Sequence, residues 1–362
     1  MRKVGVVNLP LHGGNAPRWL FWRMVKLGKA ISEAIIDEYG TDEFIQRLSN
    51  PYWFQSMACV IGFDWHSSGT TTTTCGALKQ ALNKEDFGVY FTGGKGKVSR
   101  KTLTEIEEHE DLSTNKIEQL QYASKMSAKV DNALVQDNYQ LYHHCFIFNT
   151  KGNWAVIQQG MFERYARRYH WLSDNVNFVE EPHSAICCDH KNNKTLDMTS
   201  RASNETREVS LDLVRDHPEH LRKYMNPVQK TLVEYSHDFT TYTMNPRHDI
   251  IDMHKKNFET LQKAYEIQPR TYEELVAIKG VGPKTIRSLA LISDVIYGAK
   301  ASWKDPVKYS FALGGKDKIP YEINKKHYDE TTEIMENAIN HAKIGDKDKI
   351  KAIERLGKYF NI

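Results

Sequence analysis

A short polar turn in the first half of the chain carries two side chains that can do chemistry together. Asp64 and His66 flank Trp65 and are followed by Ser67, Ser68 and Gly69. A carboxylate and an imidazole in one loop can bind a divalent metal, or can act as a base with its orienting partner. We therefore expect Asp64 to be a hard-metal ligand or a general base.

Two adjacent histidines and two adjacent glutamines lie on neighbouring predicted strands. His143 and His144 face opposite sides of their strand, so at most one of them can enter a given site. Gln158 and Gln159 follow on the next strand. Such polar groups are costly to bury without partners, so the four residues form a functional cluster, a satisfied polar network, or a solvent-facing set.

Further carboxylates follow the strand-like residues 176–179, at Glu180 and Glu181 before His183. Carboxylates with one or two imidazoles favour Mn²⁺ or Mg²⁺, whereas zinc favours thiolates at a two-residue spacing that this chain lacks. A metal-bound water could then attack a phosphodiester. The predicted catalytic residues are Asp64, His66, His143, His144, Gln159 and Glu181, and the predicted ligands of Mn²⁺ or Mg²⁺ are Asp64, His66, His144 and Glu181.

The same strands also allow a metal-free alternative. A histidine strand, a turn and a glycine-bearing strand have the shape of a half-site in phospholipase D-like nucleases. Here Cys145 stands where that motif has lysine, and Gln159-Gly160 replaces its Gly-Ser pair. These departures count against the alternative.

A helix-hairpin-helix is predicted over residues 271–296. Thr271 and Glu274 have the spacing of a capping box, and Gly280 and Gly282 permit backbone angles that are closed to other residues. The amides of such a hairpin point outward and can hold a phosphate, whatever the base sequence. The alternative is a plain glycine-rich turn in a helical bundle. The residues predicted to contact DNA here are Lys279, Gly280, Val281, Gly282, Lys284, Thr285 and Arg287.

Three functions compete at this point. The first is a metal-dependent deoxyribonuclease that acts on single-stranded or structured DNA in repair. The second is a glycosylase or abasic-site lyase, because Lys284 occupies the hairpin position of the Schiff-base lysine, with Asp294 or Asp305 downstream as its partner. The third is a DNA-binding protein without enzymatic activity.

Two further basic segments could contact nucleic acid. Lys95, Lys97 and Arg100 lie in a glycine-rich loop, and Arg167 and Arg168 alternate with aromatic residues. Phosphate neutralisation beside base stacking is typical of a single-strand groove, although such runs are often solvated faces. Lys95, Lys97, Arg167 and Arg168 join the predicted DNA contacts.

The elements that must position these residues divide into two parts. Strands are expected over residues 4–9, 87–92, 139–148 and 153–159, with helices over 18–39 and 105–133. From residue 248 onward the pattern is helical, with Gly and Pro between the helices. We therefore predict a mixed α/β (or α+β) catalytic domain over residues 1–240 and an all-α domain with the hairpin over residues 241–362.

Composition limits the class of protein. The chain has 362 residues, of which 40% are hydrophobic and 26% charged, with a net charge of +3. No apolar run approaches the roughly 20 residues of a membrane helix, so we expect neither membrane insertion nor secretion, and a cytoplasmic location. The five cysteines are odd in number and are expected to be free buried thiols.

Several motifs together resemble one known family. They are residues 9–14 (LPLHGG), 62–69 (GFDWHSSG), 142–146 (YHHCF), 158–161 (QQGM), 166–171 (ARRYHW) and 305–311 (DPVKYSF). They are similar to those of the domain-of-unknown-function 763 proteins of archaea and bacteria, over essentially the entire chain. The resemblance implies a role linked to nucleic acid, with nuclease activity as an expectation.

Overall fold

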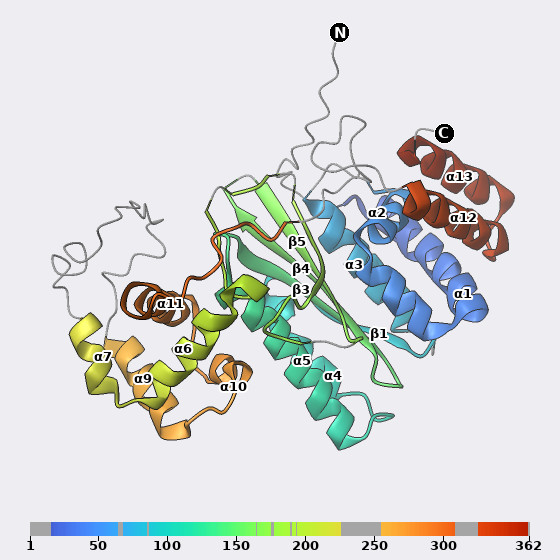
Figure 1. Cartoon of the computed structure of the whole chain (residues 1–362). Helices are drawn as coiled ribbons and strands as arrows, with labels where there is room; N and C mark the ends of the chain where they lie inside the picture. The colour runs from blue at the N-terminus through green and yellow to red at the C-terminus, as the bar shows by residue number, and fades with distance from the viewer. Residues whose placement is uncertain are drawn as a thin grey trace, which may run out of the picture.

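The computed structural model describes most of the chain. The described residues are 16–63, 68–84, 87–163, 165–174, 177–188, 190–192, 194–225, 255–307 and 325–360. A sheet lies in the middle, and helices cover both of its faces (Figure 1). Within these ranges no helix is long and apolar enough to span a bilayer.

The first half of the chain is helical and then turns into strands. Its elements are α1 (Arg18–Ser49), α2 (Pro51–Val60), α3 (Gly69–Leu82), β1 (Val89–Lys95), the 3₁₀ helix η1 (Gly96–Lys101), α4 (Thr102–Glu107), α5 (Thr114–Ala133), β2 (Val135–Gln136), β3 (Gln140–Asn149), β4 (Trp154–Phe162) and β5 (Tyr165–Leu172).

The second half returns to helices after two more strands. Its elements are β6 (His183–Cys187), β7 (Leu196–Asp197), η2 (Arg201–Ser203), α6 (Asn204–Arg215), α7 (Pro218–Met225), α9 (Lys255–Ile267), α10 (Tyr272–Ala277), α11 (Pro283–Tyr297), α12 (Lys325–His341) and α13 (Asp346–Phe360).

The main sheet is antiparallel, with the order β1-β3-β4-β5-β6. Side chains alternate between its faces along each strand. On β3, Cys145 and Ile147 belong to one hydrophobic core, and Phe146 and Phe148 belong to the other. The sheet therefore separates two cores, and both of its faces are buried.

The first core lies between the sheet and helices α1, α2 and α3. α1 bends at Gly40, whose φ of 86° interrupts the helix. Helices α12 and α13 pack on the same side, against α1 and α2 (Figure 1), and supply Met335, Ile339 and Leu356 to this core. The C-terminal helices thus return to the N-terminal ones.

The second core lies between the opposite face of the sheet and helices α5, α6, α9, α10 and α11. Phe146 and Trp171 of the sheet share it with Leu275 and Ile286 of the predicted hairpin. The helices on either side of residue 240 are thus packed onto one sheet. The predicted domain boundary itself lies outside the described residues.

The expected strands over residues 87–92, 139–148 and 153–159 are confirmed as β1, β3 and β4. The strand expected over 176–179 is wrong over its described part, 177–179, because Asn177 Oδ1 accepts hydrogen bonds from the amides of Val179 and Glu180 and closes a turn. The strand expected over residues 4–9 lies outside the described ranges.

The burial of His170 on β5 makes a prediction about acid stability. His170 is fully buried against Phe54, and burial beside Arg168 holds its pKa well below the ordinary value. An unfolded histidine takes up a proton below pH about 6.5. The contribution of the buried, neutral His170 to the free energy of unfolding is therefore fully present above that pH, and it is lost as the pH falls below it.

His170→Phe should flatten this acid-side decline, by up to about 1.4 kcal/mol per pH unit for one proton. Urea unfolding between pH about 7 and about 5 measures the slope. The exposed His341→Gln is the matched control, because His341 contacts a backbone carbonyl, and it should keep the wild-type slope. Equal slopes in wild type and His170→Phe would contradict the assignment.

Candidate functional site

The first half of the predicted hairpin is a capped helix. Thr271 Oγ1 accepts a hydrogen bond from the Glu274 amide at 3.1 Å, and Glu274 Oε2 accepts one from the Arg270 amide at 2.6 Å. Both side chains satisfy amides at the start of α10, which no helical carbonyl can reach. The expected N-terminal cap at Thr271 is confirmed.

The turn between α10 and α11 requires its first glycine. Gly280 has φ of +107°, and a Cβ there would lie 2.9 Å from Thr260 Oγ1. Val281 is 3% exposed and fills the space between the helices. Gly282 then precedes α11 with Pro283 in its first turn, and no side-chain hydrogen bond caps this helix. The start of α11 thus presents backbone rather than a capping side chain.

Among the predicted hairpin contacts, side-chain exposure separates two groups. Lys279 is exposed and Lys284 is half-buried. Thr285 and Arg287 are buried, and the Arg287 guanidinium lies 5.8 Å from the centre of the Trp303 ring. The Thr285 and Arg287 side chains therefore point into the protein, so the DNA contacts predicted at these two positions stay a prediction for their backbone amides alone.

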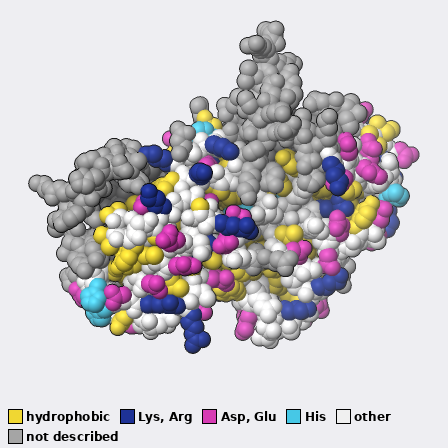
Figure 2. All heavy atoms as spheres, in the orientation of Figure 1, with side chains coloured by type: hydrophobic (Ala, Val, Ile, Leu, Met, Phe, Trp, Pro, Cys, Tyr) yellow, Lys and Arg dark blue, Asp and Glu magenta, His cyan; other side chains and the backbone are white. Residues whose placement is uncertain are grey.

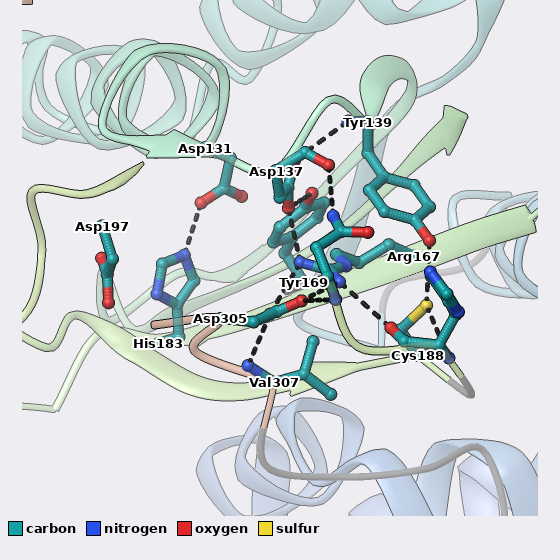
Figure 3. Close-up of polar contacts among 12 residues, drawn as sticks. Asp131, Asp137, Tyr139, Arg167, Tyr169, His183, Cys188, Asp197, Asp305 and Val307 are labelled. Atoms are coloured by element: carbon teal, nitrogen blue, oxygen red, sulfur yellow. Dashed lines mark hydrogen bonds and ion pairs between the residues drawn. The ribbon is translucent and has the colours of Figure 1, made fainter. Parts of the chain in front are cut away.

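Arg167 is likewise structural. It is fully buried, and its guanidinium donates to Asp137 at 2.9 Å and to Asp305 at 2.7 Å (Figure 3). Tyr169 Oη donates to the same Asp137 carboxylate. Asp305, one of the two partners considered for a lyase lysine, thus neutralises Arg167 instead.

Arg168 is buried on the opposite face of β5. Its guanidinium lies 4.8 Å from the Phe54 ring centre and donates to Gln55 Oε1 at 3.1 Å. β5 lies between β4 and β6, and Arg167 and Arg168, on its two faces, are both fully buried, so both faces of this strand are interior here. The predicted single-strand groove at Arg167 and Arg168 is therefore wrong.

The exposed basic residues are elsewhere. Lys95 ends β1, and Lys97, Arg100 and Lys101 follow in η1, all of them exposed. On the face of the molecule in Figure 2, basic and acidic side chains are interspersed. An anion on this face would therefore bind through a few neighbouring basic side chains rather than through a broad positive surface.

The two histidine–glutamine pairs separate across the sheet. His143 lies beside Cys75 of α3, and Gln159 Nε2 donates to the Ser68 carbonyl at 2.7 Å. His144 and Gln158 face α5 instead. The expectation that one site takes at most one of the two histidines is confirmed.

On the α5 face, the side chains form a continuous hydrogen-bonded relay. Ser124 Oγ lies 2.9 Å from His144 Nε2, and His144 Nδ1 lies 3.0 Å from Gln158 Oε1. Gln158 Nε2 donates to Asp131 at 2.6 Å, and the other oxygen of Asp131 lies 2.5 Å from His183 Nε2. We call these five residues the Ser124–His183 relay.

Asp131 determines which atoms of Gln158, His144 and Ser124 donate hydrogen bonds and which accept them. Its carboxylate accepts from Gln158 Nε2 and from Trp171 Nε1, so the oxygen of Gln158 faces His144. His144 must then carry its proton on Nδ1. Burial lowers the pKa of His144, so the neutral ring leaves Nε2 as the acceptor for the Ser124 hydroxyl. A serine hydroxyl donating to a neutral histidine is the arrangement of an activated nucleophile.

The relay opens into a pocket of about 250 Å³. Ser124, His144 and Gln158 line it, together with the exposed residues Arg100 and Lys125. Two cations beside a serine–histidine pair suit an anionic substrate.

Of the four metal ligands predicted from the sequence, the two that the structure describes, His144 and Glu181, belong to different clusters. Asp64 and His66 lie outside the described residues. His144 belongs to the relay, whereas Glu181 is 45% exposed and pairs with Arg201 at 3.6 Å. Within the described ranges, the group able to hold a metal is Cys75, His143 and Cys145, all buried. Its thiol ligands differ from the carboxylate set that we expected for Mn²⁺ or Mg²⁺.

Sequence reasoning missed Ser124, Asp131 and Cys75. Ser124 and Asp131 lie two turns apart on one face of the predicted helix over residues 105–133, and that spacing was the available signal. His143 and Cys145 lie on the same face of their strand because side chains two residues apart on a strand point to the same side. No local sequence pattern predicts which helix packs on which face of a strand.

Comparison with known proteins identifies a family without an assigned activity. The family model described as "Protein of unknown function (DUF763)" matches residues 5–323. No curated protein and no solved structure matches the chain.

Proposed function

The chain belongs to the DUF763 family of proteins of unknown function, and we propose that it binds DNA by holding the phosphodiester backbone at its helix-hairpin-helix. The observation that carries this proposal is the hairpin turn. Gly280 adopts a left-handed φ, and Gly282 leaves the N-terminus of α11 without a capping side chain. A helix N-terminus of this kind attracts an anion through its amides and its dipole.

The charges around the turn support the same ligand. Lys279 is exposed beside Gly280, and Lys284 lies in the first turn of α11. Backbone amides and lysines contact phosphate oxygens rather than base edges, so binding is independent of base sequence. Binding also weakens as salt rises, because counterions are released from the DNA.

Gly282→Asp is the sharpest test of this grip. Gly282 is extended, and a Cβ there would meet nothing nearer than 3.9 Å, so the substitution fits. Aspartate is a favoured N-cap residue, and it places a carboxylate where the phosphate would lie. We expect the thermal midpoint of unfolding to be retained. The affinity for every DNA sequence should fall by about tenfold or more, which corresponds to a loss of about 1.4 kcal/mol of binding free energy.

The chain offers a matched control in Gly345→Asp. Gly345 directly precedes α13, and its carbonyl accepts from Lys349, so the same substitution is made at another helix start. This variant should bind as wild type does in fluorescence anisotropy. A folded Gly282→Asp with unchanged affinity and salt slope would refute the hairpin as the grip.

A second candidate function, DNA cleavage, is favoured by the Ser124–His183 relay and its pocket. α5 connects the pocket to the hairpin, since it carries Ser124 and also Lys129, whose Nζ donates to the Ile278 carbonyl at 2.5 Å. A strand held at the hairpin could thus extend along α5 to Arg100 and Lys125. We propose phosphodiester hydrolysis at Ser124.

The proposed hydrolysis uses water as its only co-reactant and proceeds in two steps. Ser124 Oγ attacks phosphorus while its proton passes to His144 Nε2, and the bond to the leaving oxygen breaks. The imidazolium returns the proton to that oxygen. A water molecule, with His144 as its base, then attacks the phosphorus of the phosphoserine, the bond from phosphorus to Oγ breaks, and the proton returns through His144 to Ser124 Oγ. Arg100 and Lys125 offset the charge on the phosphoryl oxygens.

One gel separates the competing functions. Labelled single-stranded, duplex and branched DNA is incubated with EDTA, Mg²⁺ or Mn²⁺. Cleavage in EDTA supports the serine pathway, whereas cleavage only with Mn²⁺ or Mg²⁺ supports a metal site that includes Asp64 and His66. Binding without cleavage supports the non-enzymatic function, and a borohydride-trapped adduct on abasic DNA that Lys284→Ala loses supports the lyase.

A further inference from the structure

A second group of reactive side chains lies on the face of β3 opposite to the Ser124–His183 relay. It consists of Cys75 on α3 with His143 and Cys145 on β3. One potential ligand atom from each residue lies within 4.8 Å of the others, and all three side chains are at most 2% exposed. Residues two apart on a strand share a face, which brings His143 and Cys145 together under α3.

The His143 ring is the most unusual feature of this group. Neither of its ring nitrogens has a hydrogen-bond partner among the described residues, although the side chain is 1% exposed. A buried imidazole without a partner destabilises the folded state, so such groups are rare. A ligand that accepts a nitrogen lone pair would satisfy it.

We propose that Cys75, His143 and Cys145 bind a thiophilic metal ion of the zinc type. Thiolates with an imidazole select soft or borderline ions over Mg²⁺ or Mn²⁺. A divalent ion with two thiolates has no net charge, which suits a buried site. This proposal is independent of DNA binding and of the reaction at Ser124.

The fourth coordination position has a candidate ligand on the neighbouring strand. Gln159 is the cross-strand partner of His143, so its side chain lies on the same face. Its amide nitrogen donates to the Ser68 carbonyl, while its buried Oε1 has no partner within the described ranges. An ion here would join α3 to β3 and β4, and its closed setting is that of a structural site.

Metal analysis of the purified full-length chain tests this inference. Protein produced in zinc-supplemented medium and dialysed should retain one zinc per chain by mass spectrometry. Replacement by Co²⁺ should give thiolate-to-cobalt charge-transfer absorption, which reports sulfur ligands directly in the wild-type chain. Cys75→Ser and His143→Gln should each lose most of the bound metal.

Cys59→Ser is the matched control, because Cys59 is a buried cysteine of α2 outside the cluster and should not affect metal content. The wild-type cobalt spectrum decides the question if a cluster variant fails to fold. The proposal is overturned if the wild-type chain neither retains nor takes up zinc, if its cobalt spectrum lacks thiolate bands, or if Cys75 and Cys145 form a disulfide instead.

Discussion

Ser124→Ala is expected to lower the rate of DNA cleavage by a factor on the order of 10⁶, as the loss of an activated nucleophile does in serine hydrolases. The substitution removes one oxygen from a buried side chain, and that oxygen contacts His144 Nε2 at 2.9 Å. DNA affinity should remain unchanged, because the hairpin is intact. Single-turnover cleavage in EDTA measures the chemical step.

Ser127→Ala is the matched control for this prediction. Ser127 lies one turn along α5, is fully buried, and donates to the Ser124 carbonyl, so its loss removes a similar hydroxyl without touching His144. Its cleavage rate should stay near the wild-type rate. Unchanged cleavage by a folded Ser124→Ala would show that the relay is only a buried polar network.

Asp131 serves the same reaction as a positioning residue. Asp131→Asn allows Gln158 to turn its amide, so that His144 loses the acceptor that holds its proton on Nδ1. We expect the cleavage rate to fall and its pH profile to shift. A purely structural role for Asp131 would lower stability and leave that profile in place.

Arg167→Ala should destabilise the fold by about 3–5 kcal/mol, the usual cost of removing one partner of a buried ion pair. The substitution leaves Asp137 and Asp305 facing each other, both nearly inaccessible to solvent. Burial already raises the pKa of Asp137, so its uncompensated charge would be costly. Urea unfolding followed by circular dichroism measures the loss.

Arg201→Ala provides the comparison, since its side chain is 75% exposed and its ion pairs lie at the surface. Its effect should stay within about 0.5 kcal/mol. If Arg167→Ala kept the wild-type stability and lost DNA binding, then Arg167 would be a DNA contact after all.

Local patterns were sufficient for part of this protein. The alternation along residues 139–148 and the turn before residue 153 predict β3 and β4, and they place His143 and His144 on opposite faces. Gly280, Gly282 and Thr271 predict the hairpin in the same way. Each of these features depends on backbone angles and side-chain periods over a few residues, which a sequence carries directly.

Tertiary structure decided which of these residues meet. His144 finds Ser124 and Asp131 because α5 covers one face of β3, and Cys75 meets Cys145 because α3 covers the other. Arg167 has the local pattern of an exposed cation, but the segments that carry Asp137 and Asp305 cover it, and Asp305 comes from 138 residues away along the chain. An arginine has the same local pattern whether it faces water or a buried carboxylate, because the difference in free energy arises from partners that only packing brings close.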